Sequence, residues 1–368
     1  MSKKYILLLL AIAFCVIAKA QDELKLKLDS IIKTGLEKGI PGIQVVISDS
    51  EGYTIYNYGY HEVIRTNAIN DSTNWRYGSI TKLFTAVMIL QLESEGKLSI
   101  DESVSKYINL KQHNHAGITI KQLLNHTSGL YNYTSSPKLK WEDSAIECLE
   151  YSLKRDLKFS PGSTYNYSNT GYLILGLIIE KITNQSYQKN ISERIFEPCG
   201  LKSMIYCNDE KTPSNTARGY KLDYKKYKDF TEINHSWANS AGAVLGNLTD
   251  LNKFVNCLFN GNIIDSLQLK KMISPSIIYR DLNAKGKEWF YHAVGLCWDL
   301  NLDKTEKTIY VSHGGNTQGY NCDIHYNTQN NLTIIIGMNL FPSGKYEPVF
   351  GTQNRIIDAI HEYYKQKK

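Results

Sequence analysis

Two residues one helical turn apart, Ser79 and Lys82, have the types and the spacing that covalent chemistry requires. Residues i and i+3 share one face of a helix, so the Lys82 amine is expected beside the Ser79 hydroxyl. An adjacent amine can take or tune the proton that a serine must lose to act as a nucleophile. The alternative is a helix-capping serine followed by a surface lysine, and the S-x-x-K spacing alone favours it. Partner residues elsewhere in the chain must therefore decide between the two interpretations.

The apolar run Val87–Leu92 follows this pair and predicts the helix that positions it. The run is apolar around the helix, which is typical of a buried helix, and Gly96 is a stop signal. Ser79 is then expected in the first turn. There the partial positive charge of the helix N-terminus favours a developing oxyanion.

A second candidate group, Tyr167-Ser-Asn169, lies on a predicted loop just before the apolar run Leu173–Ile182. Tyr167 can lend its phenol oxygen to proton transfer, but an ordinary tyrosine has a pKa of about 10. A neighbouring ammonium such as that of Lys82 would favour the phenolate. The chain has 26 tyrosines, so Tyr167 alone is better explained as a packed aromatic.

A third group, His313-Gly-Gly315, follows a predicted strand. The two glycines let a substrate approach the backbone closely, and His313 can present a polar or cationic edge to it. The alternative, a β-turn with a solvated histidine, is favoured when the group is considered alone.

Other chemistries lack their motifs in this sequence. His113-Asn-His115 has neither the i,i+4 spacing nor a third ligand of a zinc site, and H-E-x-x-H does not occur. There is no G-x-S-x-G elbow, no P-loop and no strand-borne G-x-G-x-x-G. We therefore expect no metal and no cofactor.

Residues 1–20 are predicted to be a secretory signal peptide. A charged start precedes an apolar core at residues 5–17 and the small-x-small cleavage site Ala18-Lys-Ala20. Cys15 raises lipid attachment as a minor alternative, which the bulky Phe14 before it disfavours. We expect a periplasmic or secreted protein that meets a membrane only if it is lipidated.

The net charge of residues 21–368 argues against a nucleic-acid partner, and their cysteines leave the question of a disulfide open. Removing three lysines from a net charge of +6 leaves +3, which is too weak to indicate a nucleic-acid partner. Cys199 and Cys207 are candidates for a disulfide in an oxidising compartment, and free buried thiols are the equal alternative.

Elements at the two ends of the chain predict one sheet. An amphipathic helix is expected at residues 22–38, and a β-hairpin at 42–48 and 53–58. Further strands are predicted at 291–298, 307–311, 320–326 and 332–338, and a closing helix at 354–365. The pattern indicates an α+β fold over residues 21–368, with a sheet lobe (21–75 and 285–368) and an inserted helical lobe (76–284). A cleft between the lobes is the expected place for an active site.

Taken in order, Ser-Ile-Thr-Lys, Tyr-Ser-Asn and His-Gly-Gly resemble the motifs of the penicillin-recognising serine hydrolases. The Tyr-x-Asn form points to class C β-lactamases, D-alanyl-D-alanine carboxypeptidases, D-aminopeptidases and related esterases. Further similar stretches lie at residues 96–107, 118–130, 240–251 and 295–298. The resemblance covers residues 25–365 and implies the two-lobe β-lactamase/transpeptidase-like fold, with an antiparallel sheet flanked by helices.

The resemblance implies a role for each residue of the first two groups. Ser79 attacks a carbonyl carbon and forms an acyl-enzyme. Lys82 and Tyr167 share the proton transfer, and which of them is the base stays open. Asn169 hydrogen-bonds the substrate amide and Lys82.

It also assigns roles in the third group, where His313 replaces the usual lysine. The backbone N–H groups of Ser79 and Asn316, the latter just past Gly315, form the oxyanion hole. The middle position holds a threonine in many relatives, whose hydroxyl helps to bind a substrate carboxylate. Gly314 offers no hydroxyl, so esters, amides or D-amino-acid peptides without that carboxylate become more plausible substrates than β-lactams.

The sequence therefore predicts an exported serine hydrolase acting on an ester, an amide or peptide, or a β-lactam carbonyl. The alternative is a binding or sensor protein on the same fold that holds a cell-wall peptide or β-lactam without turnover. Retention of Ser79, Lys82, Tyr167 and Asn169 argues against that alternative.

Overall fold

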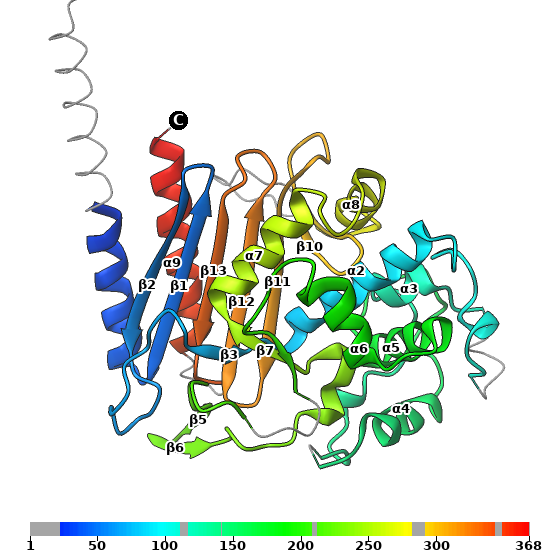
Figure 1. Cartoon of the computed structure of the whole chain (residues 1–368), viewed down its shortest axis with the longest axis horizontal. Coiled ribbons are helices and arrows are strands. Elements are labelled where there is room, and N and C mark those ends of the chain that lie inside the picture. The colour runs from blue at the N-terminus through cyan, green and yellow to red at the C-terminus, as the bar shows by residue number, and fades with distance from the viewer. Residues whose placement is uncertain are drawn as a thin grey trace, which may run out of the picture.

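The computed structural model describes residues 23–110, 117–140, 142–207, 212–281, 291–342 and 348–367. The predicted signal peptide and His113-Asn-His115 lie outside these residues. Figure 1 shows a twisted sheet at one side of the molecule and a mainly helical lobe at the other. Within the described ranges, no helix combines the length and apolar character needed to cross a membrane.

An eight-stranded antiparallel sheet is built from both ends of the chain, as the sequence predicts. Its strand order is β2-β1-β13-β12-β11-β10-β9-β8. The strands are β1 (Gly42–Asp49), β2 (Gly52–Gly59), β8 (Ile277–Asp281), β9 (Tyr291–Val294), β10 (Asp299–Leu302), β11 (Thr308–Thr317), β12 (Tyr320–Asn327) and β13 (Thr333–Met338). The N-terminal hairpin joins the C-terminal strands through β1 and β13, with Val45 opposite Ile336.

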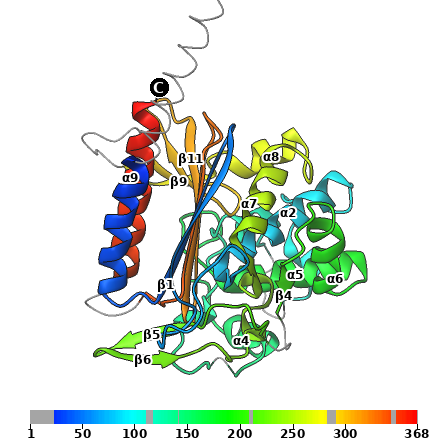
Figure 2. The same ribbon diagram turned by 60° about the vertical axis from the view of Figure 1, so that its left-hand side comes forward.

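Helices cover both faces of this sheet. The helix at residues 23–37 and α9 (Pro348–Gln366) lie together on one face, and α7 (Leu248–Phe259) lies on the other (Figure 2). Strand β1 is buried on both faces for this reason, and its Ile and Val side chains suit that position. The predicted N-terminal helix, hairpin and closing helix are confirmed.

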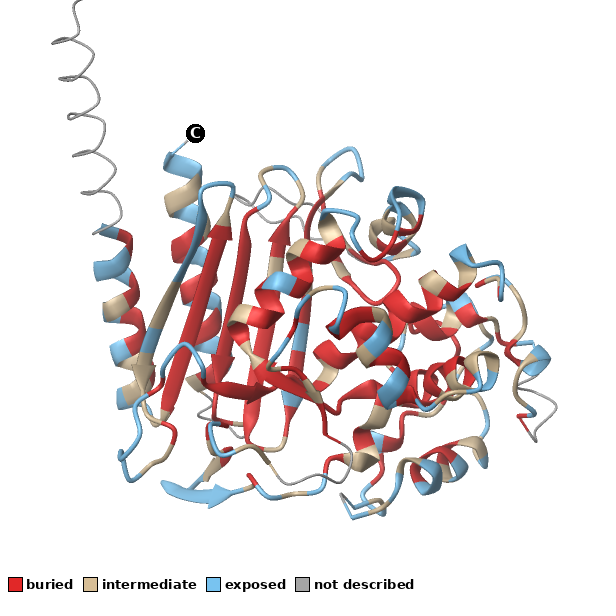
Figure 3. Ribbon diagram, viewed as in Figure 1, coloured by how far each residue is buried: buried red, intermediate tan, exposed pale blue. Residues whose placement is uncertain are grey.

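The helical lobe is organised around α2 (Thr81–Ser94). Every residue from Thr81 to Leu90 is buried, which confirms the predicted internal helix (Figure 3). Phe84 packs against Phe254 with ring centroids 4.2 Å apart. The other helices here are α3 (Ile120–Leu124), α4 (Ala145–Leu153), α5 (Asn169–Thr183), α6 (Tyr187–Ile191) and α8 (Ser266–Ile273). Small sheets are formed by β3 (Asn74–Arg76), β7 (Val244–Asn247) and β4 (Ile205–Tyr206), and by β5 (Tyr220–Asp223) and β6 (Lys226–Asp229).

The predicted strand at residues 291–298 is wrong in its second half. The chain reverses after Val294, and the N–H of Gly295 donates to the carbonyl of Trp298 across the turn between β9 and β10. Cys297 in this turn has a φ of +81°, which no regular strand accommodates. Strand β8 also begins at Ile277, before the predicted lobe boundary at residue 285.

The cysteine pairing differs from the expected one. Cys199 forms a disulfide with Cys257, their Cα atoms lying 6.0 Å apart, and Cys207 is a buried free thiol. The partner is supplied by α7, 58 residues further along the chain. Such a long-range packing contact has no signal in cysteine spacing.

Candidate active site

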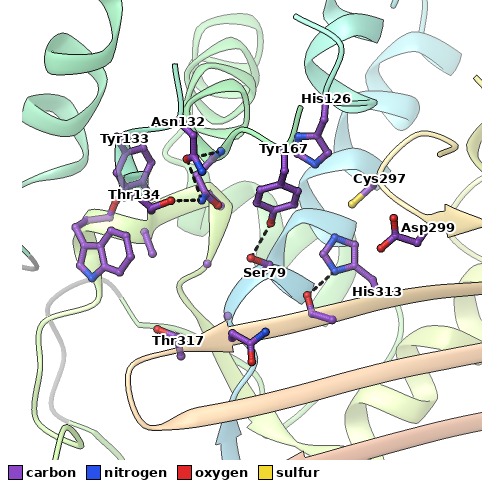
Figure 4. Close-up of a pocket in the computed structure, with 18 of the residues that line it drawn as sticks. Ser79, His126, Asn132, Tyr133, Thr134, Tyr167, Cys297, Asp299, His313 and Thr317 are labelled. Carbon is purple, nitrogen blue, oxygen red and sulfur yellow. Dashed lines mark hydrogen bonds between the residues drawn. The ribbon is translucent and has the colours of Figure 1, made fainter. Parts of the chain in front are cut away.

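A cavity of about 530 Å³ lies between strand β11 and the helical lobe, where the cleft is predicted (Figure 4). It is lined by Phe341 and by parts of six segments: residues 78–79, 126–134, 165–169, 237–242, 294–299 and 313–318. Of the predicted site residues, Ser79, Tyr167, Asn169, His313, Gly314 and Asn316 all line it. The structure thus brings together groups that are far apart in the sequence.

Ser79 lies just before α2 rather than inside its first turn. It is the middle residue of a short 3₁₀ segment, η1 (Gly78–Ile80), that leads directly into the helix. Gly78 has a φ of +52°, and a Cβ on it would lie 2.9 Å from the carbonyl carbon of Asn316. Only glycine allows this conformation and this close approach of the two backbones. Ser79 is therefore held against the edge of β11.

The Lys82 side chain is fully buried beside Ser79. Its Nζ donates to Ser79 Oγ at 3.1 Å and to the carbonyl oxygen of Ala241 at 2.6 Å. Burial lowers the pKa of Lys82 to about 7, because desolvation penalises the charged form. Near neutral pH a large fraction of the Lys82 amine is therefore uncharged and can accept a proton.

Tyr167 reaches Ser79 from the other side. Its hydroxyl donates to Ser79 Oγ at 2.8 Å (Figure 4). Its ring centroid lies 5.1 Å from the Lys82 nitrogen. Burial raises the pKa of Tyr167 well above its ordinary value, more than the hydrogen bond to Ser79 lowers it. The expectation that a nearby ammonium favours a phenolate is therefore wrong here, and Tyr167 is a phenol at neutral pH.

Asn169 lines the cavity, but its amide is engaged differently from the expectation. The side-chain N–H groups donate to Asn132 Oδ1 at 3.2 Å and to Thr134 Oγ1 at 3.1 Å. Lys82 instead donates to the Ala241 carbonyl, which takes the place expected for Asn169. The amide of Asn169 is thus fixed to the loop that carries Asn132.

His313 is neutral and lies within β11, not after a strand. It is 4% exposed, and its Nδ1 lies 2.9 Å from the carbonyl oxygen of Gly314. A carbonyl oxygen only accepts hydrogen bonds, so Nδ1 carries the proton and Nε2 does not. Burial, and then the charge of Lys82, lower the pKa of His313 to about 3. The prediction of a cationic His313 and the alternative of a solvated histidine in a β-turn are both wrong.

The two glycines of β11 differ in the space around them. A Cβ on Gly315 would lie 1.8 Å from the carbonyl oxygen of Tyr77, so no side chain fits there. A Cβ on Gly314 would meet only Asp323 Oδ1, at 3.6 Å. Gly315 is thus required by the approach of the Ser79 segment, whereas Gly314 leaves room for a side chain.

The predicted oxyanion hole stays a prediction with geometric support. Asn316 borders the cavity, and its backbone lies against that of Gly78, one residue before Ser79. The two peptide segments that must supply the N–H donors are therefore adjacent. Two such donors facing one oxygen stabilise the charge of a tetrahedral intermediate.

Several residues of the site were missed from the sequence. His126, Asn132 and Trp237 line the cavity, as do Cys297 and Asp299 (Figure 4). His126 belongs to the stretch at residues 118–130 that resembles the family, which is its signal in the sequence. Asn132 lies on a loop and Trp237 in a short 3₁₀ segment, η6 (Ser236–Ala241), and neither stretch has a periodic pattern.

The described residues contain no group of three or more His, Cys, Asp or Glu side chains placed to bind a metal ion.

Comparison with known proteins agrees with this geometry. The model of the Beta-lactamase family matches residues 28–356. The chain belongs to the Beta-lactamase family. It has the β-lactamase/transpeptidase-like fold predicted from the sequence.

Three relatives illustrate the range of this family. Protein flp of Staphylococcus aureus is 28% identical over 88% of this chain, and the chain spans only 64% of that relative's length. Penicillin-binding protein 4* of Bacillus subtilis is 28% identical over 79% of this chain and 66% of its own length. The D-amino acid amidase of Ochrobactrum anthropi SV3, solved with L-phenylalanine amide, is 25% identical. That match has a TM-score of 0.79 and covers 92% of this chain and 99% of the amidase.

Proposed function

We propose that this protein is an exported serine hydrolase that cleaves esters or amides, including peptides, by acyl transfer through Ser79. The observation that carries the proposal is the pair of hydrogen bonds at Ser79 Oγ, from Lys82 at 3.1 Å and from Tyr167 at 2.8 Å. A nucleophile needs a proton acceptor within hydrogen-bond reach, and this serine has two proton-transferring groups in contact.

The protonation states assign the two groups different tasks. The uncharged amine of Lys82 takes the proton from Ser79 as Oγ bonds to the carbonyl carbon of the substrate. The Tyr167 phenol, held next to the same oxygen, passes a proton to the leaving alcohol or amine and is reprotonated from Lys82. The carbonyl oxygen gains negative charge and is held by the N–H groups of Ser79 and Asn316. Water then attacks the acyl-enzyme along the reverse proton path and releases the acid.

The charges around the cavity favour substrates without a carboxylate at the β11 edge. No lysine or arginine is among the described residues that line the cavity, and His313 is neutral. Gly314 offers no hydroxyl, and the space beside it faces the Asp323 carboxylate. An anionic group there would find no lysine or arginine among those described residues to pair with and would lie near a carboxylate that Gln353 and His325 already contact.

Export is proposed from the sequence of residues 1–20, with its charged start, apolar core and small-x-small site. Expression in a bacterial host followed by N-terminal sequencing tests it. A periplasmic or secreted product that begins at Gln21 supports export, whereas a product that retains Met1 in the cytoplasm contradicts it.

The catalytic proposal is tested on purified residues 21–368 with a nitrophenyl ester, an amino-acid amide and a fluorophosphonate probe. Wild type is expected to turn over at least one substrate and to be labelled at Ser79. Ser79→Ala is expected to lose both properties. Identical behaviour of the two proteins would contradict the proposal. Intact-mass spectra that show a persistent acyl adduct without product release would indicate a sensor instead of a hydrolase.

A further inference from the structure

His126 forms hydrogen bonds with the residues immediately before and after Tyr167. The carbonyl oxygen of His126 accepts from the N–H of Asn166 at 2.9 Å, and its Nδ1 accepts from the N–H of Ser168 at 3.2 Å. The imidazole also stacks on the Tyr167 ring, with centroids 4.3 Å apart and planes tilted by 34°. His126 thus makes two hydrogen bonds and one ring contact with the segment Asn166–Ser168.

The chemistry of these contacts determines the state of the ring. A backbone N–H can only donate, so Nδ1 of His126 must be unprotonated and the proton must lie on Nε2. His126 is 4% exposed, and burial lowers its pKa well below the ordinary value for histidine. The ring is therefore neutral. In the described part of the chain its Nε2 has no hydrogen-bond partner. Of the two ring nitrogens, only Nδ1 forms a hydrogen bond among the described residues, as the acceptor for the N–H of Ser168.

His126 is itself held rigidly. It has a φ of +58°, in a turn where Asn125 Oδ1 accepts from the backbone and the side chain of Thr127. The carbonyl of the neighbouring Leu124 accepts from the Tyr172 hydroxyl at 2.8 Å. His126 is thus an anchored element. Residues 165–168 form neither helix nor strand before α5 begins at Asn169.

We infer that His126 is a positioning residue that holds Tyr167 at the distance from Ser79 needed for proton transfer. The inference rests on the proposed function in that Tyr167 transfers a proton. His126 does not need to touch the reacting atoms. It fixes the backbone before and after Tyr167 and one face of its ring, which leaves the hydroxyl few positions other than the one 2.8 Å from Ser79. A displacement of about 1 Å in such a group can lower a rate by about 100-fold.

Two substitutions separate the contacts. His126→Phe keeps a ring for stacking and removes the acceptor for Ser168. His126→Asn keeps an acceptor near the position of Nδ1, and asparagine tolerates the left-handed backbone. We expect kcat to fall about 100-fold in His126→Phe and to recover at least partly in His126→Asn, with KM little changed. His61→Phe is the matched control, because His61 is buried and hydrogen-bonded to Thr73 but does not line the cavity.

A double-mutant cycle tests whether His126 acts through Tyr167. In a Tyr167→Phe background, which lacks the hydroxyl, His126→Phe should cause no further loss of kcat. A merely structural role would lower the activity in both backgrounds and would affect His61→Phe similarly. Wild-type activity in His126→Phe, or equal losses in the two backgrounds, would overturn the inference.

A spectroscopic measurement tests the hydrogen bond without reference to activity. In ¹⁵N-histidine-labelled protein, the His126 ring, identified by its absence in His126→Asn or His126→Phe, should carry its proton on Nε2 from pH 6 to 8. A proton on Nδ1 would overturn the inference even if the enzyme is active. An inactive wild type with the expected tautomer would instead contradict the proposed function and would still support the contacts of His126 with the Tyr167 segment.

Discussion

The Lys82 amine donates to the backbone carbonyl of Ala241 at 2.6 Å, closer than it lies to Ser79. A carbonyl oxygen orients the amine without bringing a formal negative charge to it. A carboxylate in that place would stabilise the ammonium and raise the pKa of Lys82. The backbone contact therefore holds the lysine in position while allowing burial to keep it a base near neutral pH.

This protonation state predicts the pH dependence of hydrolysis. With the pKa of Lys82 at about 7, kcat/KM for a neutral ester should rise from pH 6 to pH 8 with a midpoint near 7. A pH–rate profile with an uncharged substrate measures it. A rise that begins only above pH 9 would indicate instead that the Tyr167 phenolate is the base, and a flat profile would contradict both assignments.

Burial of Lys82 also predicts a conflict between activity and stability. Its pKa is about 7 in the folded protein, below the ordinary 10.5, so the unfolded chain binds more protons between those values. Stability linked to this group therefore rises with pH across that window and is lowest below pH 7. Lys82→Met should abolish hydrolysis and increase the free energy of unfolding at pH 6, by at most roughly 5 kcal/mol.

Urea denaturation at pH 6 and pH 9 measures the effect. The advantage of Lys82→Met over wild type should shrink at pH 9, because the folded-state amine is then uncharged and pH 9 is closer to the unfolded-state pKa of 10.5, which reduces the cost of burying this lysine in its uncharged form. A larger advantage at pH 9 than at pH 6 would sink this interpretation.

The glycines of β11 predict opposite responses to the same substitution. Gly315→Ala places a Cβ against the Tyr77 carbonyl, so it should destabilise the protein by about 3 kcal/mol and separate β11 from the Ser79 segment. Gly314→Ala meets no such contact and is the matched control, with a melting temperature close to that of wild type. Equal melting temperatures for the two variants would show that the strand can move aside without cost.

Gly314 also predicts the substrate preference. Wild type should hydrolyse the cephalosporin nitrocefin slowly compared with short esters, because no hydroxyl is present beside the Asp323 carboxylate. Gly314→Thr should raise the ratio of nitrocefin to ester turnover by roughly tenfold, the worth of one hydrogen bond to a charged group. Fast nitrocefin turnover by wild type at low substrate concentration would contradict the assignment of a carboxylate-free substrate.

The sequence predicted the features of this site that depend on local geometry. Ser79 and Lys82 are one turn apart, so their contact follows from helical spacing almost regardless of the rest of the fold. The partner of Asn169 could not be predicted, because Asn132 reaches it from a separate loop. His126 offered no signal of its role, since its acceptor serves a backbone N–H that any residue at position 168 would supply.

The same limit applies to the fold. Alternating and apolar patterns identified the hairpin and the C-terminal strands, because the pattern that marks a strand is contained in its own residues. The disulfide between Cys199 and Cys257 depends on how α7 packs, and the turn at Cys297 depends on a left-handed residue that is not glycine. Both are decided by tertiary contacts that outweigh local preference.

The pairing of β1 with β13 has a consequence for how the enzyme matures. Val45 lies opposite Ile336, and the Ser79 segment contacts β11, so the site is complete only when distant parts of the chain have paired. Contacts of such high sequence separation form late and slowly in folding. A growing or partly translocated chain already carries Ser79, Lys82 and Tyr167 but lacks the strand that completes the site. Hydrolytic activity is therefore expected to appear only after the C-terminal strands have emerged and docked.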